Sequence, residues 1–516
     1  MRETDTRTGS GRGRDGRDGR EVLVIGGGIA GLAAAHRLLT GSSAADPVRV
    51  TVLEASDRLG GKLRAGEIAG ARVDLGAESL LARRPEAVGL ARDVGLTDRL
   101  TPPATATASI WTRDALRPMP KGHVMGVPGT ADALAGVLSD EGLRRIAQDA
   151  ELPPTELGDD VAVGAYVAAR LGREVVDRLV EPLLGGVYAG DAYRISMRSA
   201  VPQLFEEARR HPTLMEAVRA IQARAAANQQ TGPVFMGIEG GVGTLPDAVA
   251  DAVRQSGGEI VMGERATSLG ARGTARATTT NAHPTADREP LWRVVTESGR
   301  TFDADQVVIA LPAPAAASLL RTASPKASQE LRAIEYASMA LITLAYDRNR
   351  AELPAGSGFL VPPVDGRTIK AATFASQKWG WIADENPDLL LVRTSVGRYG
   401  DEKDLTRDDD DLTDIARNDL NEAIGLTATP VASHVTRWQD GLPQYPVGHP
   451  ARVTRIREHL AQLPGIAVCG AAYDGVGIPA CIASAHAAVD ELRGDLGARD
   501  ELKANPVQSL HGGAGE

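Results

Sequence analysis

A glycine-rich turn near the N-terminus constrains the fold more than any other feature of the sequence. Residues 21–25 (EVLVI) form a short apolar run, and residues 32–39 (LAAAHRLL) are strong helix formers. The turn between them is Gly26-Gly27-Gly28-Ile29-Ala30-Gly31. In this spacing the first glycine makes the turn, the second admits a pyrophosphate to the backbone, and the third lets the helix pack on the strand. We therefore expect the strand, turn and helix of a dinucleotide-binding unit here.

The residues after this turn indicate which dinucleotide is bound. Residues 48–54 (VRVTVLE) predict a second strand ending in Glu54, whose carboxylate can accept hydrogen bonds from ribose hydroxyls. A second glycine turn follows, in which two cations can offset phosphate or flavin charge; its candidate cofactor ligands are Ala55, Arg58, Gly60, Gly61 and Lys62. Residues 63–68 and 71–75 predict a hairpin that leads into a loop of Gly76, Ala77, Glu78 and Ser79. Because an enzyme that uses only a nicotinamide does not need these elements, the pattern favours FAD.

Composition and charge exclude several classes of protein. The chain has 516 residues, with 57 Lys and Arg against 67 Asp and Glu, for a net charge of −10. This acidic balance, without a basic stripe, argues against nucleic acid as a partner. No run reaches the roughly 18 apolar residues that a membrane-spanning helix needs. The only two cysteines, Cys469 and Cys481, are expected to be free thiols. We therefore expect a soluble, cytoplasmic protein of two or three domains.

Four further blocks of sequence carry a resemblance to a known family. They are residues 119–128 (MPKGHVMGVP), 181–190 (EPLLGGVYAG), 437–445 (RWQDGLPQY) and 472–479 (AYDGVGIP). With these blocks in this order, the chain resembles the flavin amine oxidase superfamily, and within it the protoporphyrinogen/coproporphyrinogen III oxidases of haem synthesis. His123 departs from the small residue expected at that point, which leaves the detailed transfer of substrate contacts open.

The resemblance implies an α/β fold of three parts. The FAD-binding, Rossmann-like domain is assembled from discontinuous segments, residues 21–100, 232–311 and 435–495. Residues 101–118 with 312–434 form a mixed α+β substrate-binding domain, and residues 119–231 form a helical insertion. The segments 1–20 and 496–516, which are polar and lack periodicity, are expected to be disordered tails.

The resemblance also implies further flavin contacts. Residues 466–470 predict a strand and 480–492 a helix, and Pro479 suits the first turn of that helix. The helix N-terminus, with Val476, Gly477 and Ile478, would face the pyrimidine edge of the flavin; an ordinary strand-to-helix connection is the alternative. Trp438 is assigned to the cofactor and Ala266 to the adenine. The glycine cluster at residues 240–245 is not followed by a nicotinamide site, which favours an oxidase over a reductase.

The activity that the resemblance implies is the oxidation of a porphyrinogen. The flavin takes a hydride from a methylene bridge, three rounds remove six electrons, and each round returns one hydrogen peroxide to solution. Cations at the rim of the substrate site would hold the propionates, and the candidates are Arg84, Lys121 and Lys378. A single Lys or Arg is more often a solvated surface charge, and Arg84 is preferred because its loop is tethered to Ser79 near the isoalloxazine. No catalytic base and no metal ligand are assigned, because the nine histidines are scattered.

The identity of the substrate stays open among several alternatives. The four-carboxylate coproporphyrinogen III suits an acidic enzyme without an evident membrane anchor, and protoporphyrinogen IX is the alternative. A flavoprotein that binds porphyrin without turnover would keep every motif. An amine oxidase or a carotenoid desaturase would not predict the blocks at residues 181–190 and 473–479. The expected partners are the porphyrinogen, oxygen and, as a candidate, the next enzyme of haem synthesis, with membrane contact absent or peripheral.

Overall fold

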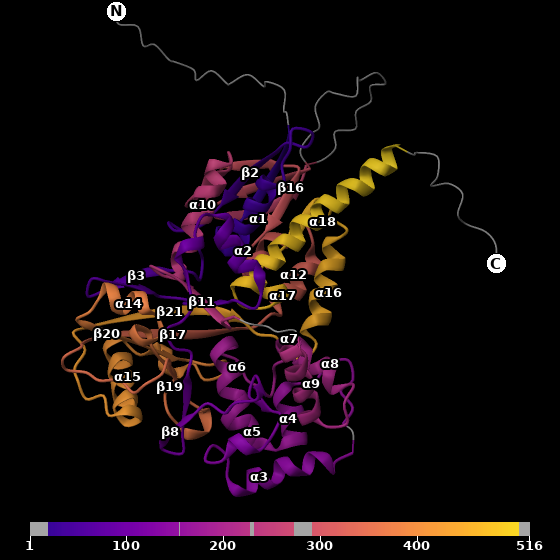
Figure 1. The fold of residues 1–516 in the computed structure, drawn as a ribbon. Helices are drawn as coiled ribbons and strands as arrows, with labels where there is room; N and C mark the ends of the chain where they lie inside the picture. Colours follow the sequence, from indigo (N-terminus) through magenta and orange to yellow (C-terminus); the bar gives the residue numbers. More distant parts are fainter. Residues whose placement is uncertain (1–18, 154, 228–231, 273–290, 505–516) are drawn as a thin grey trace, which may run out of the picture.

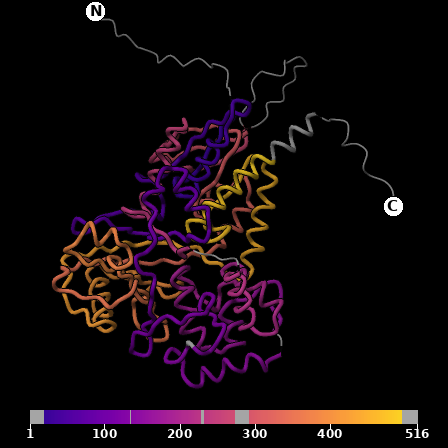
Figure 2. The backbone as a smooth tube through the Cα atoms, in the orientation of Figure 1, coloured from indigo at the N-terminus to yellow at the C-terminus, as the bar shows by residue number. Residues whose placement is uncertain are grey.

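The computed structural model describes residues 19–153, 155–227, 232–272 and 291–504. Three parts are visible, with a nucleotide domain at the top of the view, a sheet domain at the lower left and a helical domain at the lower right (Figure 1). Segments from both ends of the chain meet in the nucleotide domain (Figure 2). The predicted α/β fold with a discontinuous nucleotide domain is confirmed.

A five-stranded parallel sheet forms the centre of the nucleotide domain. Its order is β12 (Glu259–Val261), β2 (Val48–Leu53), β1 (Arg20–Ile25), β16 (Gln306–Ile309) and β22 (Ile466–Val468). Side chains alternate along β1, so that Val22 and Val24 join one core and Leu23 and Ile25 join another. Both faces are therefore covered, as parallel sheets require.

Helices and a small sheet cover these two faces. The first core contains α1 (Ile29–Thr40), α2 (Pro85–Asp93), α10 (Leu245–Gln255) and α18 (Ile478–Ala504). The second core contains α11 (Ala313–Leu320), α12 (Pro325–Arg332), α16 (His449–Leu460) and the sheet of β13 (Ala266–Ala271), β14 (Trp292–Thr296) and β15 (Thr301–Ala304). We assigned residues 312–434 to the substrate domain, and for α11 and α12 this is wrong, because their Ala- and Leu-rich faces are buried on the nucleotide sheet.

The predicted ends of the ordered chain also need correction. Arg20, placed in the N-terminal tail, begins β1 and its buried guanidinium donates to Gln306 at 3.0 Å. Residues 496–504, placed in the C-terminal tail, continue α18. Residues 1–18 and 505–516 lie outside the described residues.

The sheet domain is built on seven strands. Their order is β21 (Ala432–Pro443), β17 (Tyr336–Asp347), β20 (Leu389–Val396), β19 (Ile369–Phe374), β18 (Gly358–Leu360), β7 (Ala108–Thr112) and β8 (Ala115–Pro118). Helix α15 (Asp409–Ile424) buries Leu412, Ala416 and Leu420 against one face. We assigned residues 435–443 to the nucleotide domain, which is wrong, because β21 pairs along most of β17.

A hairpin from the nucleotide domain packs against this sheet domain. Strands β3 (Ala65–Ile68) and β4 (Ala71–Asp74) form the predicted hairpin. Ile68, Val73 and Leu75 share a core with Ala345 of β17 and Leu391 of β20. The loop that follows β4 is therefore held at the junction of the nucleotide and sheet domains.

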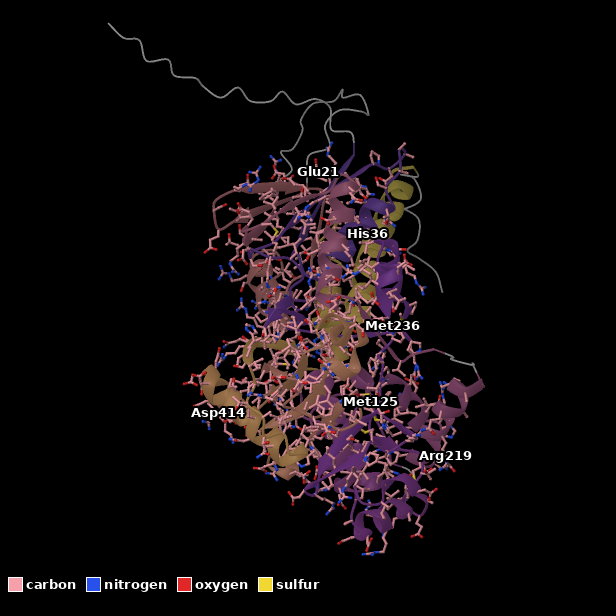
Figure 3. All side chains as sticks on the ribbon, turned by 60° about the vertical axis from the view of Figure 1, so that its left-hand side comes forward. Glu21, His36, Met125, Arg219, Met236 and Asp414 are labelled. Atoms are coloured by element: carbon pink, nitrogen blue, oxygen red, sulfur yellow. The ribbon has the colours of Figure 1, made fainter. Side chains whose placement is uncertain are left out.

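The helical domain lies within the predicted range of residues 119–231, of which residues 154 and 228–231 are outside the described residues. Its helices are α3 (Asp140–Ala147), α4 (Val163–Leu171), α5 (Arg173–Val175), α6 (Glu181–Tyr188), α7 (Met197–Ala200), α8 (Pro202–Ala208) and α9 (Leu214–Ala227), which enclose one apolar core. Within that core Arg170 and Asp149 are almost fully buried and form an ion pair of 2.6 Å. Figure 3 shows Arg219 of this domain and Asp414 of α15 on separate lower parts of the molecule, with Glu21 at the opposite end. Among the described helices, none combines the length and apolarity that a bilayer crossing needs.

Candidate flavin site

The first glycine turn adopts the geometry that the spacing predicts. Gly26 has a φ of +111°, and Gly28 caps the N-terminus of α1, in which Ile29 and Ala30 lie. A Cβ on Gly31 would lie 1.9 Å from the carbonyl oxygen of Gly26, so only glycine allows the helix this close to the strand. A Cβ on Gly28 would meet no atom within 4 Å. The backbone beside Gly28 therefore has open space, which fits a pyrophosphate at a helix N-terminus.

The acid that ends β2 is bonded into this turn. The Oε2 of Glu54 accepts a hydrogen bond from the N–H of Gly27 at 2.8 Å, and its Oε1 accepts from the N–H of Ser56 at 2.8 Å. The N–H of Glu264 donates to the carbonyl of Glu54 at 2.9 Å, which brings the start of β13, with Ala266, beside it. Ala55 lies between Glu54 and Ser56. The predicted ribose and adenine ligands are thus close together, although some 200 residues separate them in sequence.

The second glycine turn packs on the first. The N–H of Gly60 donates to the carbonyl of Gly27 at 2.9 Å, and a Cβ on Gly61 would lie 3.4 Å from the Cα of Gly28. The guanidinium of Arg58 donates to the carbonyls of Leu59 and Gly61, at 3.3 and 2.8 Å. Burial, together with the neighbouring charge of Arg64, lowers the pKa of Arg58. Arg58 therefore stabilises the turn through two of its carbonyls.

Lys62 links this turn to the loop after β4. The residue as a whole is exposed to solvent. Its ammonium group nevertheless has protein around it, and this desolvation lowers its pKa. The ammonium lies 5.9 Å from the centre of the Tyr336 ring. A Cβ on Gly76 would lie 2.1 Å from the carbonyl oxygen of Lys62. The two turns and the flavin loop, residues 74–79, therefore lie against one another.

The flavin loop is tied both to the rest of the nucleotide domain and to the sheet domain. The Asp74 carboxylate accepts from the N–H groups of Val242 and Gly243, at 2.9 and 2.8 Å. Burial, partly offset by these two hydrogen bonds, raises the pKa of Asp74 to about 6. The glycine cluster at residues 240–245 therefore lies against the start of the flavin loop. On the other side, Nε1 of Trp438 donates to the carbonyl of Leu75 at 2.9 Å.

Glu78 carries the strongest electrostatic interaction of the loop. Its Oε1 lies 2.5 Å from the ammonium of Lys378, and its Oε2 lies 3.1 Å from the guanidinium of Arg393. Burial opposes ionisation of this carboxylate, but Arg393 and Lys378 overcome it and hold its pKa at about 2. Ser79 follows Glu78 and is half-buried. The carboxylate is therefore an ionised anchor between the nucleotide and sheet domains.

The first turn of α18 closes the remaining side of the site. Gly475 and Gly477 have φ values of +123° and +103°, and Val476 lies between them. The helix begins at Ile478, and Asp474 just before it accepts two hydrogen bonds from Arg457, at 2.8 and 2.7 Å. Burial raises the pKa of the Cys481 thiol to about 11, and the ammonium group of Lys62 opposes this rise. Before this turn, Ala471–Asp474 form the short helix α17.

The three predicted substrate cations are not brought together. The Arg84 guanidinium is 41% exposed and pairs with Glu86 at 2.8 Å. Lys121 lies in an exposed turn of the helical domain. Lys378 lies at the flavin loop, but its ammonium is already paired with Glu78. Arg393 was missed, although a single charged residue inside the apolar strand LLLVRTSV was a signal for it.

Comparisons with known proteins agree with this geometry. Residues 29–493 match the family described as flavin containing amine oxidoreductase. A coproporphyrinogen III oxidase of Mycobacterium bovis is 38% identical over 475 residues, which covers 92% of this chain and 97% of that one. A protoporphyrinogen oxidase of Bos taurus is 27% identical over 501 residues, covering 92% and 99%.

Solved structures show the same similarity. The crystal structure of an Exiguobacterium protein is 31% identical, has a TM-score of 0.78, and covers 93% of this chain and 100% of that one. The glycine turns, the acid after β2 and the open space beside Gly28 fit a bound flavin nucleotide. The chain is a flavin oxidoreductase and belongs to the flavin containing amine oxidoreductase family.

Proposed function

We propose that this chain is an oxygen-dependent, FAD-containing coproporphyrinogen III oxidase of haem synthesis that acts in the cytoplasm. It removes six electrons from coproporphyrinogen III and gives coproporphyrin III and hydrogen peroxide. The observation that carries the proposal is the nearly full-length similarity to coproporphyrinogen III oxidases, at 38% identity, which is supported by a glycine turn with open space beside Gly28 and by the acid Glu54 after β2. The lower identity to the protoporphyrinogen oxidase, 27%, makes protoporphyrinogen IX the second candidate.

The residues of the chain supply binding and orientation. The redox chemistry, hydride removal from a methylene bridge of the porphyrinogen and transfer of the electrons to oxygen, would be supplied by bound FAD. The ribose and pyrophosphate would be held by Glu54 and by the backbone from Gly26 to Gly31, with the helix N-terminus facing the anion. Arg58 and Lys62 would offset phosphate or flavin charge. Val476, Gly477 and Ile478 would present the N-terminus of α18 to the flavin ring.

The substrate carboxylates require cations, and the structure distinguishes among the candidates. We keep Arg84 and Lys121 as proposed propionate ligands, because both side chains are accessible. Lys378 is better explained as a partner of Glu78. Replacing Arg84 by Met should raise KM for coproporphyrinogen III about tenfold, as expected for the loss of a charge-assisted hydrogen bond. Arg83→Met, at the exposed neighbouring position, is the matched control and should leave KM unchanged.

The direct test compares two substrates in air. Purified, FAD-loaded protein is mixed with reduced coproporphyrinogen III or protoporphyrinogen IX, and porphyrin fluorescence is followed against a control without enzyme. We expect a higher kcat/KM for coproporphyrinogen III, with oxygen consumption and peroxide formation matching the electrons removed. The reverse preference would make the chain a protoporphyrinogen oxidase. Porphyrin binding without acceleration of either oxidation would leave a non-catalytic flavoprotein.

A further inference from the structure

Three consecutive carbonyl groups of the flavin loop are bound by side chains of the sheet domain. Arg393 of β20 donates through one nitrogen to the carbonyls of Asp74 and Gly76, at 3.1 and 2.8 Å. Trp438 of β21 donates to the carbonyl between them, that of Leu75, at 2.9 Å. The second terminal nitrogen of Arg393, Nη2, pairs with the carboxylate of Glu78. Arg393 thus makes three contacts with a segment of five residues.

Binding these carbonyls determines where the N–H groups of the loop point. In a trans peptide the C=O and the following N–H lie on opposite sides of the bond, and no cis peptide occurs in the described chain. With the carbonyls of Leu75 and Gly76 turned toward Trp438 and Arg393, the N–H groups of Gly76 and Ala77 point the other way. Within the described residues neither N–H has a protein acceptor, whereas the N–H of Leu75 donates to Arg64. Ala77 is exposed although residues 73–76 are buried.

Only glycine at position 76 lets the loop adopt this orientation, because the surrounding atoms leave no room for a Cβ. A Cβ on Gly76 would lie 2.1 Å from the carbonyl oxygen of Lys62 and 3.2 Å from the ring of Trp438. The loop is therefore confined between the second glycine turn and the sheet domain. Its two free donors point away from the carbonyls that Arg393 and Trp438 bind, and Ala77 is exposed.

We propose that Arg393 is a positioning residue for the flavin: it turns the N–H groups of Gly76 and Ala77 toward an electron-rich edge of the bound isoalloxazine. The sheet domain, which carries no part of the nucleotide-binding turns, thereby controls the affinity and the reduction potential of the cofactor. Hydrogen bonds from preorganised N–H groups stabilise developing negative charge, so the reduced flavin gains more than the oxidised one. This inference needs a bound flavin but does not depend on which porphyrinogen is the substrate.

Two substitutions remove the contacts separately. Arg393→Met releases the carbonyls of Asp74 and Gly76, and Trp438→Phe releases that of Leu75 while keeping most of the ring packing. We expect the Kd for FAD to rise about tenfold or more in Arg393→Met, because the lost donor was charged. The midpoint potential should become more negative, by about 30 mV for each tenfold loss of preference for two-electron-reduced flavin. Trp438→Phe should change both quantities in the same direction by less.

Controls separate positioning from a general loss of structure. Arg348→Met is the matched control. Arg348 is exposed, and its guanidinium donates to one carbonyl of β20, that of Leu389, which lies away from the flavin loop. Arg393→Lys keeps the charge near Glu78 and should restore the potential only in part, since an ammonium lacks the planar fork. The far-ultraviolet circular dichroism and Tm of the flavin-free protein report folding independently. Native folding of Arg393→Met and Trp438→Phe with unchanged Kd and potential would overturn the proposal, whatever the substrate assay shows.

Discussion

Replacing Glu78 by Gln tests whether the ion triad of Glu78, Lys378 and Arg393 stabilises the fold. The carboxylate is buried, with only 10% of the side chain exposed, and lies 2.5 Å from Lys378 and 3.1 Å from Arg393. Its pKa of about 2 lies below the ordinary 4.5. Because one pKa unit corresponds to about 1.4 kcal/mol, the ionised triad contributes about 3 kcal/mol to the free energy of unfolding at neutral pH.

The sign of the pH dependence follows from the direction of this shift. A carboxylate whose folded pKa is depressed stabilises the protein fully above its unfolded pKa, and the contribution is lost as pH falls through the folded value. The stability difference between the native chain and Glu78→Gln should therefore be about 3 kcal/mol at pH 7. It should shrink between pH 4.5 and about 2. Urea unfolding, followed by tryptophan fluorescence and circular dichroism at several pH values, measures this difference.

Two controls separate the effect of the ion triad from the effects of flavin loss and of the substitution itself. Unfolding is repeated with saturating FAD and with the flavin-free protein, because loss of a ligand lowers apparent stability by mass action. Glu385→Gln is the matched control, since Glu385 is exposed and the described residues give it no ion pair. A difference below 1 kcal/mol at pH 7, or one that stays constant down to pH 3, would refute the reasoning.

Four other substitutions follow from the same structure. Gly31→Ala should displace α1, so it should abolish the 450 nm absorbance of bound flavin and lower the Tm. Gly28→Ala should also abolish flavin binding, but the Tm of its flavin-free form should equal that of the flavin-free native chain, because the added Cβ meets open space. Arg170→Met leaves Asp149 charged and buried, so calorimetry should show a loss of about 3–5 kcal/mol in the helical domain; an unchanged transition would contradict this. His449 is buried, and this lowers its pKa to about 4. The neutral imidazole therefore stabilises the fold above pH 6.5, and this contribution is lost as pH falls toward 4. His449→Phe should flatten the profile of stability against pH in that window, and an unaltered profile would exclude this explanation.

The nucleotide-binding unit could be predicted because its constraints are local. Gly26, Gly28 and Gly31 are close in sequence, and each is required by a turn, an open approach or a packing contact. Glu54 follows directly from the end of the next strand. The same holds for the hairpin β3–β4, whose positive-φ residues Ala69 and Gly70 mark the turn.

The domain boundaries and the ion triad could not be predicted in the same way. Lys378 and Glu78 are 300 residues apart, and nothing near Lys378 in sequence shows which carboxylate it meets. Helices α11 and α12 have apolar faces that would suit either neighbouring domain, so periodicity alone does not assign them. Strand β21 was misplaced for a similar reason, because a strand carries no local mark of the sheet that it joins.

The strand order of the nucleotide sheet has a consequence for synthesis of the protein. Strand β1 pairs with β16, which emerges from the ribosome some 280 residues later, and β16 in turn pairs with β22 near the end of the chain. Such non-local pairing is slow to form and leaves apolar strand edges exposed until the partners arrive. A nascent or truncated chain that ends before Ile466 thus cannot complete the sheet. The apolar strand β16 therefore keeps one unpaired edge until residues 466–468 have been made.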